Sequence, residues 1–533
     1  MEVYMSIDSH NLSRRSILRM IGGVAGSVAL YNSMMTLGLA NTSDFKGSPD
    51  LKDAPKGASV LILGAGIAGL VAAYELQKAG YNVKLLEYND RIGGRIWSIR
   101  GGDKYTELGG FTQECTYADG EYFNPGPWRV PYHHQGYMHY AREFGVEMQP
   151  FQQFNQNAYL HNSQAFDGKP QRFKHILADY KGHTNELLAK AVYQDQLDAP
   201  ITKENKEMLL ESLRSWGALD KDFRYTAQSA ASVRGWEKDP DAHHGGTPSK
   251  PIDLKSILDS KLWASLSDIF EYDYAPSIFQ PVGGMDQLPK AMGKEIGNIV
   301  TYNAKITKIM QDTDDVTVTY IDQKSGLEKE ETASWCICTI PFSILSQIEN
   351  NLNPKMKEGI SAVHYATGFK AGIEFNRRFW EEDDQIYGGI SITDLPIEMI
   401  SYPSNGYLKK GKAVLLGSYL FGPNSFEFSS LSPEERLEKT MKYLEKIHPQ
   451  AREEFSSAMS VAWHRVPFSL GCYGLWTTES RDKHFKNVAT MDRRVVLAGE
   501  HISYIPAWQE GAILSSLEAI RQLHENATQN SEG

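Results

Sequence analysis

Three glycines at a fixed spacing are the first residues whose chemistry can be inferred. Gly64, Gly66 and Gly69 follow a short apolar segment, residues 59–63, and begin a segment with helical periodicity. In a strand–turn–helix unit the first glycine permits the tight turn, the second lets a pyrophosphate approach the backbone, and the third lets helix and strand pack closely. A second apolar segment ends in Glu87, 23 residues after Gly64, where a carboxylate can bind an adenosine ribose. These residues predict a dinucleotide-binding unit.

The residues that follow distinguish between two dinucleotides. The pattern Glu-x-x-x-Arg-x-Gly-Gly-Arg spans residues 87–95. NAD dehydrogenases do not need such an extension. The pattern resembles the extension of the dinucleotide fold found in the flavin amine oxidase superfamily. The resemblance implies that FAD is the cofactor, that Arg95 contacts its diphosphate, and that the backbone of Gly93 and Gly94 passes close to the flavin.

Further segments resemble the same superfamily in the same order along the chain. Residues 281–289 are similar to the segment that returns to the flavin, and Ile306 matches a strand position whose backbone meets the adenine. Glu500 follows an Ala-Gly pair, which by resemblance implies a position near the ribityl and diphosphate groups. The helical segment that contains Ile513 would point its N-terminus at the pyrimidine edge of the flavin.

Three residues are expected to form the face on which the substrate reacts. Hydride transfer from an amine needs a donor carbon held against the flavin N5 and a path for oxygen. By resemblance, Lys370 holds a water at N5 and assists reoxidation by oxygen, while Tyr473 and Trp508 sandwich the amine. Residue type alone would also allow a solvated edge lysine and two core aromatic side chains.

The segment Gly-Pro-Trp-Arg-Val-Pro, residues 126–131, bears on the substrate. It resembles a segment of L-amino acid oxidases whose arginine binds the substrate α-carboxylate beside the flavin. The resemblance assigns that role to Arg129, sets Trp128 and Arg129 against the cofactor, and gives Tyr419 the second carboxylate hydrogen bond. Residues 111–123 make the approach to this segment longer than in those oxidases, so a surface or core-capping role for Arg129 stays open.

The cysteines and histidines show no disulfide or metal signature. Four cysteines occur, without a Cys-x-x-Cys pair. Cys472 lies in a segment similar to the one in which monoamine oxidases carry a flavin-linked cysteine, whereas L-amino acid oxidases generally bind FAD non-covalently, and non-covalent FAD is the prediction. His133, His134 and His139 lack both HExxH spacing and a carboxylate partner, so no metal site is predicted.

The elements that position these residues must belong to several domains. The chain has 533 residues, of which 41% are hydrophobic and 23% charged, so about three globular units are expected. The predicted fold class is α+β/α/β, with a discontinuous FAD-binding dinucleotide fold, a mixed-sheet substrate domain and a helical domain. The FAD-binding domain is predicted at residues 57–110, 275–345 and 485–530, the substrate-binding domain at 111–150 and 346–484, and the helical domain at 151–274.

The N-terminus has the features of an export signal. Arg14 and Arg15 precede an uncharged segment, residues 20–40, whose glycines and polar residues lower its hydropathy below that of a good membrane anchor. It resembles a twin-arginine signal peptide, residues 1–40, followed by a linker, residues 41–56. The resemblance predicts a periplasmic or secreted protein with no stable membrane span after processing.

Together with the resemblance, these residues predict an exported FAD-dependent L-amino acid oxidase. It would convert an L-amino acid and O2 to a 2-oxo acid, ammonia and hydrogen peroxide. Three alternatives stay open: a monoamine or polyamine oxidase, an amino acid 2-monooxygenase, and a non-catalytic exported flavoprotein. The net charge of −11 argues against a nucleic-acid partner, and a homodimer is one assembly that the sequence leaves open.

Overall fold

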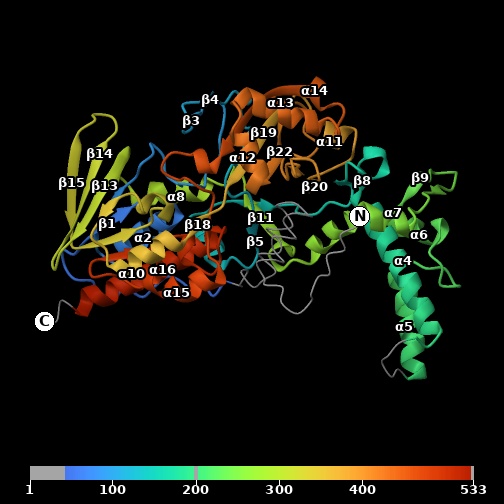
Figure 1. Cartoon of the computed structure of the whole chain (residues 1–533), viewed down its shortest axis with the longest axis horizontal. Coiled ribbons are helices and arrows are strands. Elements are labelled where there is room, and N and C mark those ends of the chain that lie inside the picture. The colour runs from blue at the N-terminus through green and yellow to red at the C-terminus, as the bar shows by residue number, and fades with distance from the viewer. Residues whose placement is uncertain (1–42, 197–201, 530–533) are drawn as a thin grey trace, which may run out of the picture.

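The apolar segment before the glycine motif forms the centre of a parallel sheet. In the computed structural model, which describes residues 43–196 and 202–529, this sheet has the strand order β12-β2-β1-β16-β25 (Figure 1). All neighbouring strands in it are parallel. Its members come from three distant parts of the chain: β1 (Ser59–Leu63), β2 (Asn82–Leu86), β12 (Val300–Thr301), β16 (Trp335–Cys338) and β25 (Val495–Leu497).

The alternation of side chains along β1 builds a core on each face of this sheet. Val60 and Ile62 belong to one core, and Leu61 and Leu63 belong to another. Because successive strand residues point to opposite faces, four consecutive apolar residues require that both faces be covered. The first core also receives residues of α2 (Ile67–Lys78), α3 (Gln135–Glu143), α8 (Gln287–Ile296) and α16 (Gln509–Gln529).

A second sheet and two helices supply much of the other core. The sheet has the order β15-β14-β13-β17 and lies at one end of the molecule (Figure 1). Its strands are β13 (Ala304–Gln311), β14 (Val316–Asp322), β15 (Glu328–Ala333) and β17 (Glu349–Asn350), and the helices are α10 (Pro354–Ala362) and α15 (Thr478–Ala489). Ile306 lies on β13, so this sheet brings it to the edge of the dinucleotide fold.

A mixed seven-stranded sheet forms the next layer, in the order β23-β19-β22-β21-β20-β7-β8. Only the β20–β7 pair is parallel among its described strand pairs. The strands are β7 (Tyr159–His161), β8 (Gln171–Arg172), β19 (Gly368–Phe375), β20 (Ile390–Thr393), β21 (Met399–Ser401), β22 (Ala413–Phe421) and β23 (Phe455–Ala462). All eight residues of β19 are buried, which makes it a central strand of this layer.

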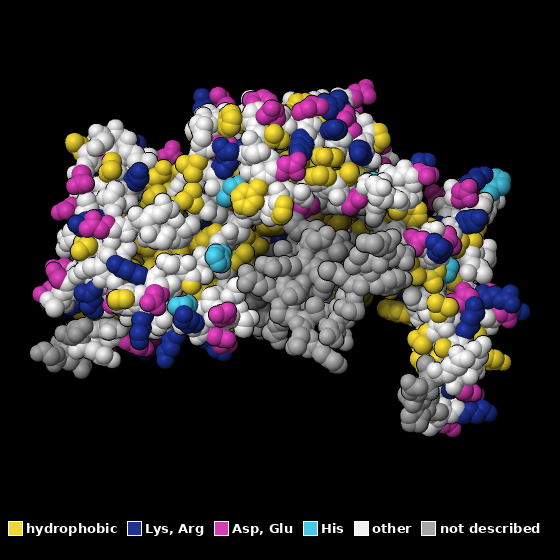
Figure 2. Space-filling view, in the orientation of Figure 1, with side chains coloured by type: hydrophobic (Ala, Val, Ile, Leu, Met, Phe, Trp, Pro, Cys, Tyr) yellow, Lys and Arg dark blue, Asp and Glu magenta, His cyan; other side chains and the backbone are white. Residues whose placement is uncertain are grey.

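A helical arm extends away from these layers, as Figure 1 shows. It contains α4 (Phe173–Tyr193), α5 (Lys203–Trp216), α6 (Ala227–Arg234) and α7 (Leu254–Ser260). A small sheet links the chain before and after the arm; its strands are β5 (Val130–Pro131), β11 (Ile278–Pro281) and β6 (Met148–Pro150). On the visible face, positive and negative side chains are interspersed over the layers and the arm (Figure 2).

The predicted fold class is confirmed by this arrangement of mixed and parallel sheets with helices. The predicted signal peptide, residues 1–40, lies outside the described residues. Within residues 43–196 and 202–529, every helix is too short or too polar to cross a bilayer.

A buried ion pair joins the hairpin of β3 (Lys104–Thr106) and β4 (Thr112–Glu114) to helix α13 (Pro433–Leu444). Arg436 donates from Nη1 to Glu107 Oε2 at 2.9 Å and from Nη2 to Oε1 at 2.6 Å. Both side chains are 0% exposed, and Arg465 Nε lies 3.1 Å from the same carboxylate. Arg436 and Arg465 therefore share the buried Glu107 carboxylate as their counter-charge.

Replacing Glu107 with Gln should lower the unfolding free energy of the holoenzyme by about 3–5 kcal/mol, because it leaves Arg436 buried without a counter-charge. Denaturant unfolding measures the change. Glu211→Gln, at the exposed pair with Arg214, is the matched control and should hardly alter stability. Equal stability of the two variants would contradict the prediction.

Candidate cofactor and substrate site

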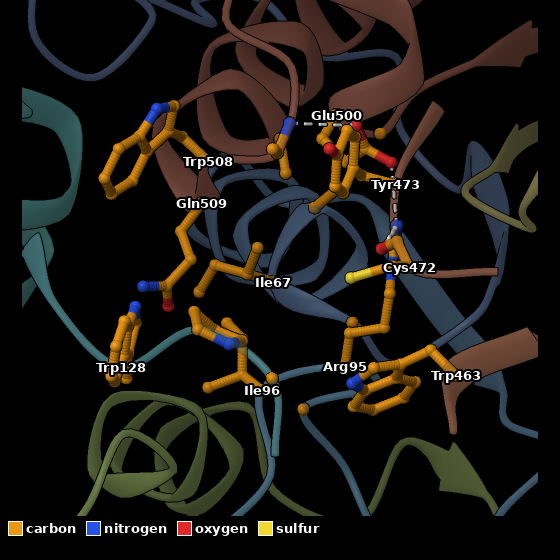
Figure 3. Close-up of a pocket in the computed structure, with 18 of the residues that line it drawn as sticks. Ile67, Arg95, Ile96, Trp128, Trp463, Cys472, Tyr473, Glu500, Trp508 and Gln509 are labelled. Atoms are coloured by element: carbon orange, nitrogen blue, oxygen red, sulfur yellow. Dashed lines mark hydrogen bonds and ion pairs between the residues drawn. The ribbon is translucent and has the colours of Figure 1, made fainter. Parts of the chain in front are cut away.

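Two adjoining cavities lie at the C-terminal edge of the parallel sheet. The larger has a volume of about 1020 Å³ and the smaller about 680 Å³, both counted with their open mouths. Both are lined by Gly66, Arg95, Thr339 and Trp463, so they share a wall. Figure 3 shows the larger cavity, and Ile67, a lining residue at the start of α2, lies in the middle of the view.

The glycine turn leaves open space at the start of α2. Gly64 has a φ of 102°, a backbone conformation that residues other than glycine rarely adopt. A Cβ at Gly69 would lie 1.9 Å from the Gly64 carbonyl oxygen, so this glycine is needed for close packing. At Gly66, in contrast, a Cβ would meet nothing within 4 Å. The helix N-terminus therefore faces a space that suits a diphosphate.

Glu87 lies at the smaller cavity, at the end of β2. Its side chain accepts hydrogen bonds from the Ala65 backbone N–H, at 2.7 Å, and from the backbone N–H of Asn89, at 2.8 Å. These bonds fix the carboxylate beside the glycine turn. Ile306 lines the same cavity. The cavity thus has the carboxylate and the apolar wall that an adenosine requires.

Arg95 and Glu500 connect the two cavities through an ion pair. Arg95 Nη1 lies 2.7 Å from Glu500 Oε1 and also donates to the Cys472 carbonyl oxygen at 2.7 Å. Glu500 in turn accepts the Gly474 N–H at 3.0 Å. A guanidinium fixed in this way at the cavity wall can bind a phosphate with its remaining N–H groups.

Aromatic side chains line the part of the larger cavity away from the glycine turn. In Figure 3, Trp128 and Trp508 lie on one side of this cavity, and Tyr473 and Cys472 lie on the other. Helix α16 begins at Gln509, which lines the same space, so its N-terminal dipole is directed toward the cavity. This part of the site is therefore largely aromatic and positive at one end.

Arg129 lies where the larger cavity meets a third one, and Tyr419 lines both. Arg129 is 6% exposed. Its Nη1 donates to Gln153 Oε1 at 2.7 Å, whereas its buried Nε has no hydrogen-bond partner among the described residues. Burial raises the pKa of Tyr419 well above its usual value, so its hydroxyl remains a donor.

Lys370 lies one layer behind the cavity wall and is 1% exposed. Its Nζ donates to the Gly126 carbonyl oxygen at 2.6 Å and lies 4.5 Å from the Trp128 ring centroid and 4.4 Å from that of Tyr419. Lys370 on β19 pairs directly opposite Tyr419 on β22. Burial lowers the pKa of Lys370 to about 7, and the nearby Arg129 charge acts in the same direction.

Most of the residues predicted from sequence thus line these adjoining cavities. Among the exceptions, Gly69 packs within the turn, Ile513 on α16 is buried in the core, and Lys370 lies behind the wall. Sequence reasoning missed Gln153 and Tyr274, whose ring centroid lies 4.5 Å from Arg129 Cζ. Both lie in segments without a motif, and only the fold brings them to Arg129.

A dinucleotide fold whose cavity continues from a diphosphate cradle into an aromatic pocket defines a dinucleotide-dependent oxidoreductase. The chain belongs to the flavin containing amine oxidoreductase family, whose model matches residues 67–524. The predicted cofactor, FAD, is thereby confirmed, and the protein is an enzyme of the flavin-dependent amine oxidase superfamily.

Relatives and solved structures agree with this family. The chain is 30% identical over 483 residues to an L-amino-acid oxidase of Bothrops pauloensis, covering 87% of this chain and 89% of the relative. It is 29% identical over 486 residues to an L-amino-acid oxidase of Siganus canaliculatus, covering 88% and 86%. The fold is similar to cyclohexylamine oxidase from Brevibacterium oxydans, with a TM-score of 0.58, 15% identity and coverage of 90% and 100%. It is also similar to putrescine oxidase bound to putrescine, with a TM-score of 0.55, 18% identity and coverage of 90% and 99%.

Cys472 lines the larger cavity, and its thiol should form no covalent bond to FAD. Burial raises the pKa of this thiol to about 11, although the charges of Arg95 and Lys370 oppose the shift. A protonated thiol is a poor nucleophile. Acid precipitation of the holoenzyme should therefore release the flavin into the supernatant, and Cys472→Ala should retain the wild-type flavin content. A yellow pellet that disappears in Cys472→Ala would contradict this.

Proposed function

We propose that the protein is a FAD-dependent L-amino acid oxidase and that Arg129 and Tyr419 bind the substrate carboxylate. The observation that supports this is a buried cation at the cavity wall with an unused donor. Arg129 forms no direct ion pair with a described residue: its Nη1 donates to the neutral amide of Gln153, and the buried Asp273 carboxyl acts on its charge without contacting it. A buried charge without a directly bonded counter-charge is unfavourable, so the site suits an anionic group of the ligand.

The surroundings of Arg129 fix its direction without neutralising it. The centroids of the Trp128, Tyr274 and Trp508 rings lie 5.0, 4.5 and 5.8 Å from its Cζ. Ring faces attract a guanidinium but leave its charge available for a carboxylate. An amine without a carboxylate would leave this charge unpaired, which favours amino acids over amines as substrates.

The remaining residues orient the substrate and exclude water. When bound, FAD supplies the acceptor for the hydride that leaves the substrate Cα. Tyr473 and Trp508 confine the amine between aromatic faces, while Tyr419 donates its hydroxyl hydrogen to the carboxylate. The overall reaction is L-amino acid + O2 + H2O → 2-oxo acid + NH3 + H2O2. We further propose that it takes place after export, on the basis of Arg14 and Arg15.

Arg129→Ala should lower kcat/KM for the best L-amino acid by about 30- to 1000-fold, since a buried bidentate contact contributes roughly 2–4 kcal/mol. Tyr419→Phe should lower it by about 10- to 150-fold, or roughly 1.5–3 kcal/mol. Steady-state peroxide formation measures both effects. The corresponding decarboxylated amine is the control substrate and should respond little to either change, and the exposed Arg142→Ala is the control variant.

Equal losses for amino acid and amine would contradict the carboxylate site and favour a monoamine or polyamine oxidase. An amide product without stoichiometric peroxide would instead identify an amino acid 2-monooxygenase. Flavin that no amino acid or amine reduces would identify a non-catalytic flavoprotein.

Lys370→Met should lower kcat/KM for oxygen by roughly 10-fold or more, because a buried ammonium one layer behind the wall still stabilises, through the low-dielectric interior, the negative charge that develops on reduced oxygen. The pKa of about 7 means that Lys370 loses its proton as the pH rises. The wild-type kcat/KM for oxygen should therefore fall through neutral pH, and that of the variant should be flat. Anaerobic reduction by the amino acid is the control and should change little. An unchanged oxygen profile in Lys370→Met would contradict this role.

A further inference from the structure

Two adjacent histidines and one aspartate come together behind the aromatic wall of the cavity. His133 and His134 precede α3, and Asp273 lies in the short helix η4 (Tyr272–Tyr274). The three are 6%, 1% and 5% exposed. One potential ligand atom from each lies within 4.8 Å of the other two. The sequence alone disfavoured a metal here because it offered no carboxylate near the histidines, and the fold supplies Asp273.

Four of the six polar side-chain atoms of this cluster lack hydrogen-bond partners among the described residues. They are Nδ1 and Nε2 of His133, Nε2 of His134, and Oδ2 of Asp273. Buried polar groups are nearly always paired, so each unpaired atom needs an explanation. The Asp273 carboxyl also interacts with the Trp508 indole and with the Arg129 charge, but these interactions leave the imidazole nitrogens of His133 and Nε2 of His134 without a partner. A ligand bound between the three side chains would satisfy those nitrogens.

One distance within the cluster matches the distance between two ligands of a metal ion. His133 Nε2 and Asp273 Oδ1 lie 3.4 Å apart, and His133 Nε2 has no hydrogen-bond partner. Two ligands at about 2.0–2.1 Å from a tetrahedral ion are roughly 3.4 Å from each other.

We propose that His133, His134 and Asp273 bind one divalent transition-metal ion, with Zn²⁺ as the best match. Two imidazole nitrogens and one carboxylate oxygen are donors that Zn²⁺ accepts readily, whereas Mg²⁺ and Ca²⁺ prefer oxygen ligands alone. A water would complete a tetrahedral shell.

The site is separate from the substrate cavity but touches its wall. None of the three residues lines the described cavities. The His134 ring centroid lies 4.9 Å from that of Trp508, and Asp273 directly precedes Tyr274, which contacts Arg129. A bound ion would therefore help to fix the positions of Trp508 and Tyr274 in the cavity wall.

The test measures zinc on the purified holoenzyme after chelator treatment and dialysis against ZnCl2. Mass spectrometry should find one tightly held Zn²⁺ per chain, and Zn²⁺ should raise the midpoint of thermal unfolding. Asp273→Asn and His134→Gln should each weaken zinc binding by at least roughly 100-fold and remove the thermal shift. The matched control is His244→Gln, at an exposed pair in which His244 Nδ1 lies 3.0 Å from Asp241 Oδ2. This variant should still bind one Zn²⁺ per chain tightly.

Wild-type holoenzyme that retains no Zn²⁺ would overturn the proposal, as would equal retention by Asp273→Asn. Loss of the ion in His244→Gln would assign it to the exposed pair instead, and overturn it too. If a variant at a buried position fails to fold, the zinc content of the wild-type holoenzyme still tests the proposal. Co²⁺ loaded in place of Zn²⁺ should give the visible absorption of a tetrahedral nitrogen–oxygen site, and an octahedral spectrum would count against it.

Discussion

The Arg95–Glu500 ion pair connects parts of the chain that are 405 positions apart. Arg95 also donates to the Cys472 carbonyl, and Glu500 also accepts the Gly474 N–H, so three segments meet at one partly buried contact. An isolated buried charge would be strongly unfavourable, so the buried Glu500 requires the half-buried Arg95 as its counter-charge. Because β25 and α16 flank Glu500 in the sequence, the same contact positions the helix N-terminus at the cavity. The discontinuous fold and the cofactor space therefore depend on one electrostatic constraint.

The two arginines of the larger cavity differ in how the protein treats their charge. Arg95 has a carboxylate partner from the protein, which fixes it as part of the wall. Arg129 contacts the amide of Gln153 and aromatic ring faces, and the Asp273 carboxyl acts on its charge without a direct contact. Since a protein gains little from burying a cation without a bonded counter-ion, the arrangement is explained most simply by a ligand that brings a negative charge into contact. The difference between the two sites thus separates cofactor binding from substrate binding within one cavity.

Local sequence could predict the parts of the site that depend on backbone conformation. Gly64, Gly66 and Glu87 belong to one strand–turn–helix–strand unit, so their spacing alone places them together. Gln153, Tyr274 and Asp273 could not be found in this way, because their contacts with the site arise from the packing of the helical arm and the small sheet against the cavity wall. Lys370 illustrates an intermediate case: a motif located it beside the flavin, but only the fold shows that it lies behind Trp128 and Tyr419 and donates to a backbone carbonyl.

The pairing of β19 with β22 couples two steps of the proposed reaction. Lys370 and Tyr419 are directly opposite in this antiparallel pair, so their side chains lie on the same face of the sheet. A slip of one residue in the register would turn one of the two away from that face, and the complete burial of β19 strongly opposes such a slip. The positions of the residue proposed to bind the carboxylate and of the residue proposed to assist oxygen are therefore not independent. Substitutions in the core of the mixed sheet that disturb this register should impair substrate binding and the reaction with oxygen together, whereas changes confined to the Arg129 side chain should affect only the first.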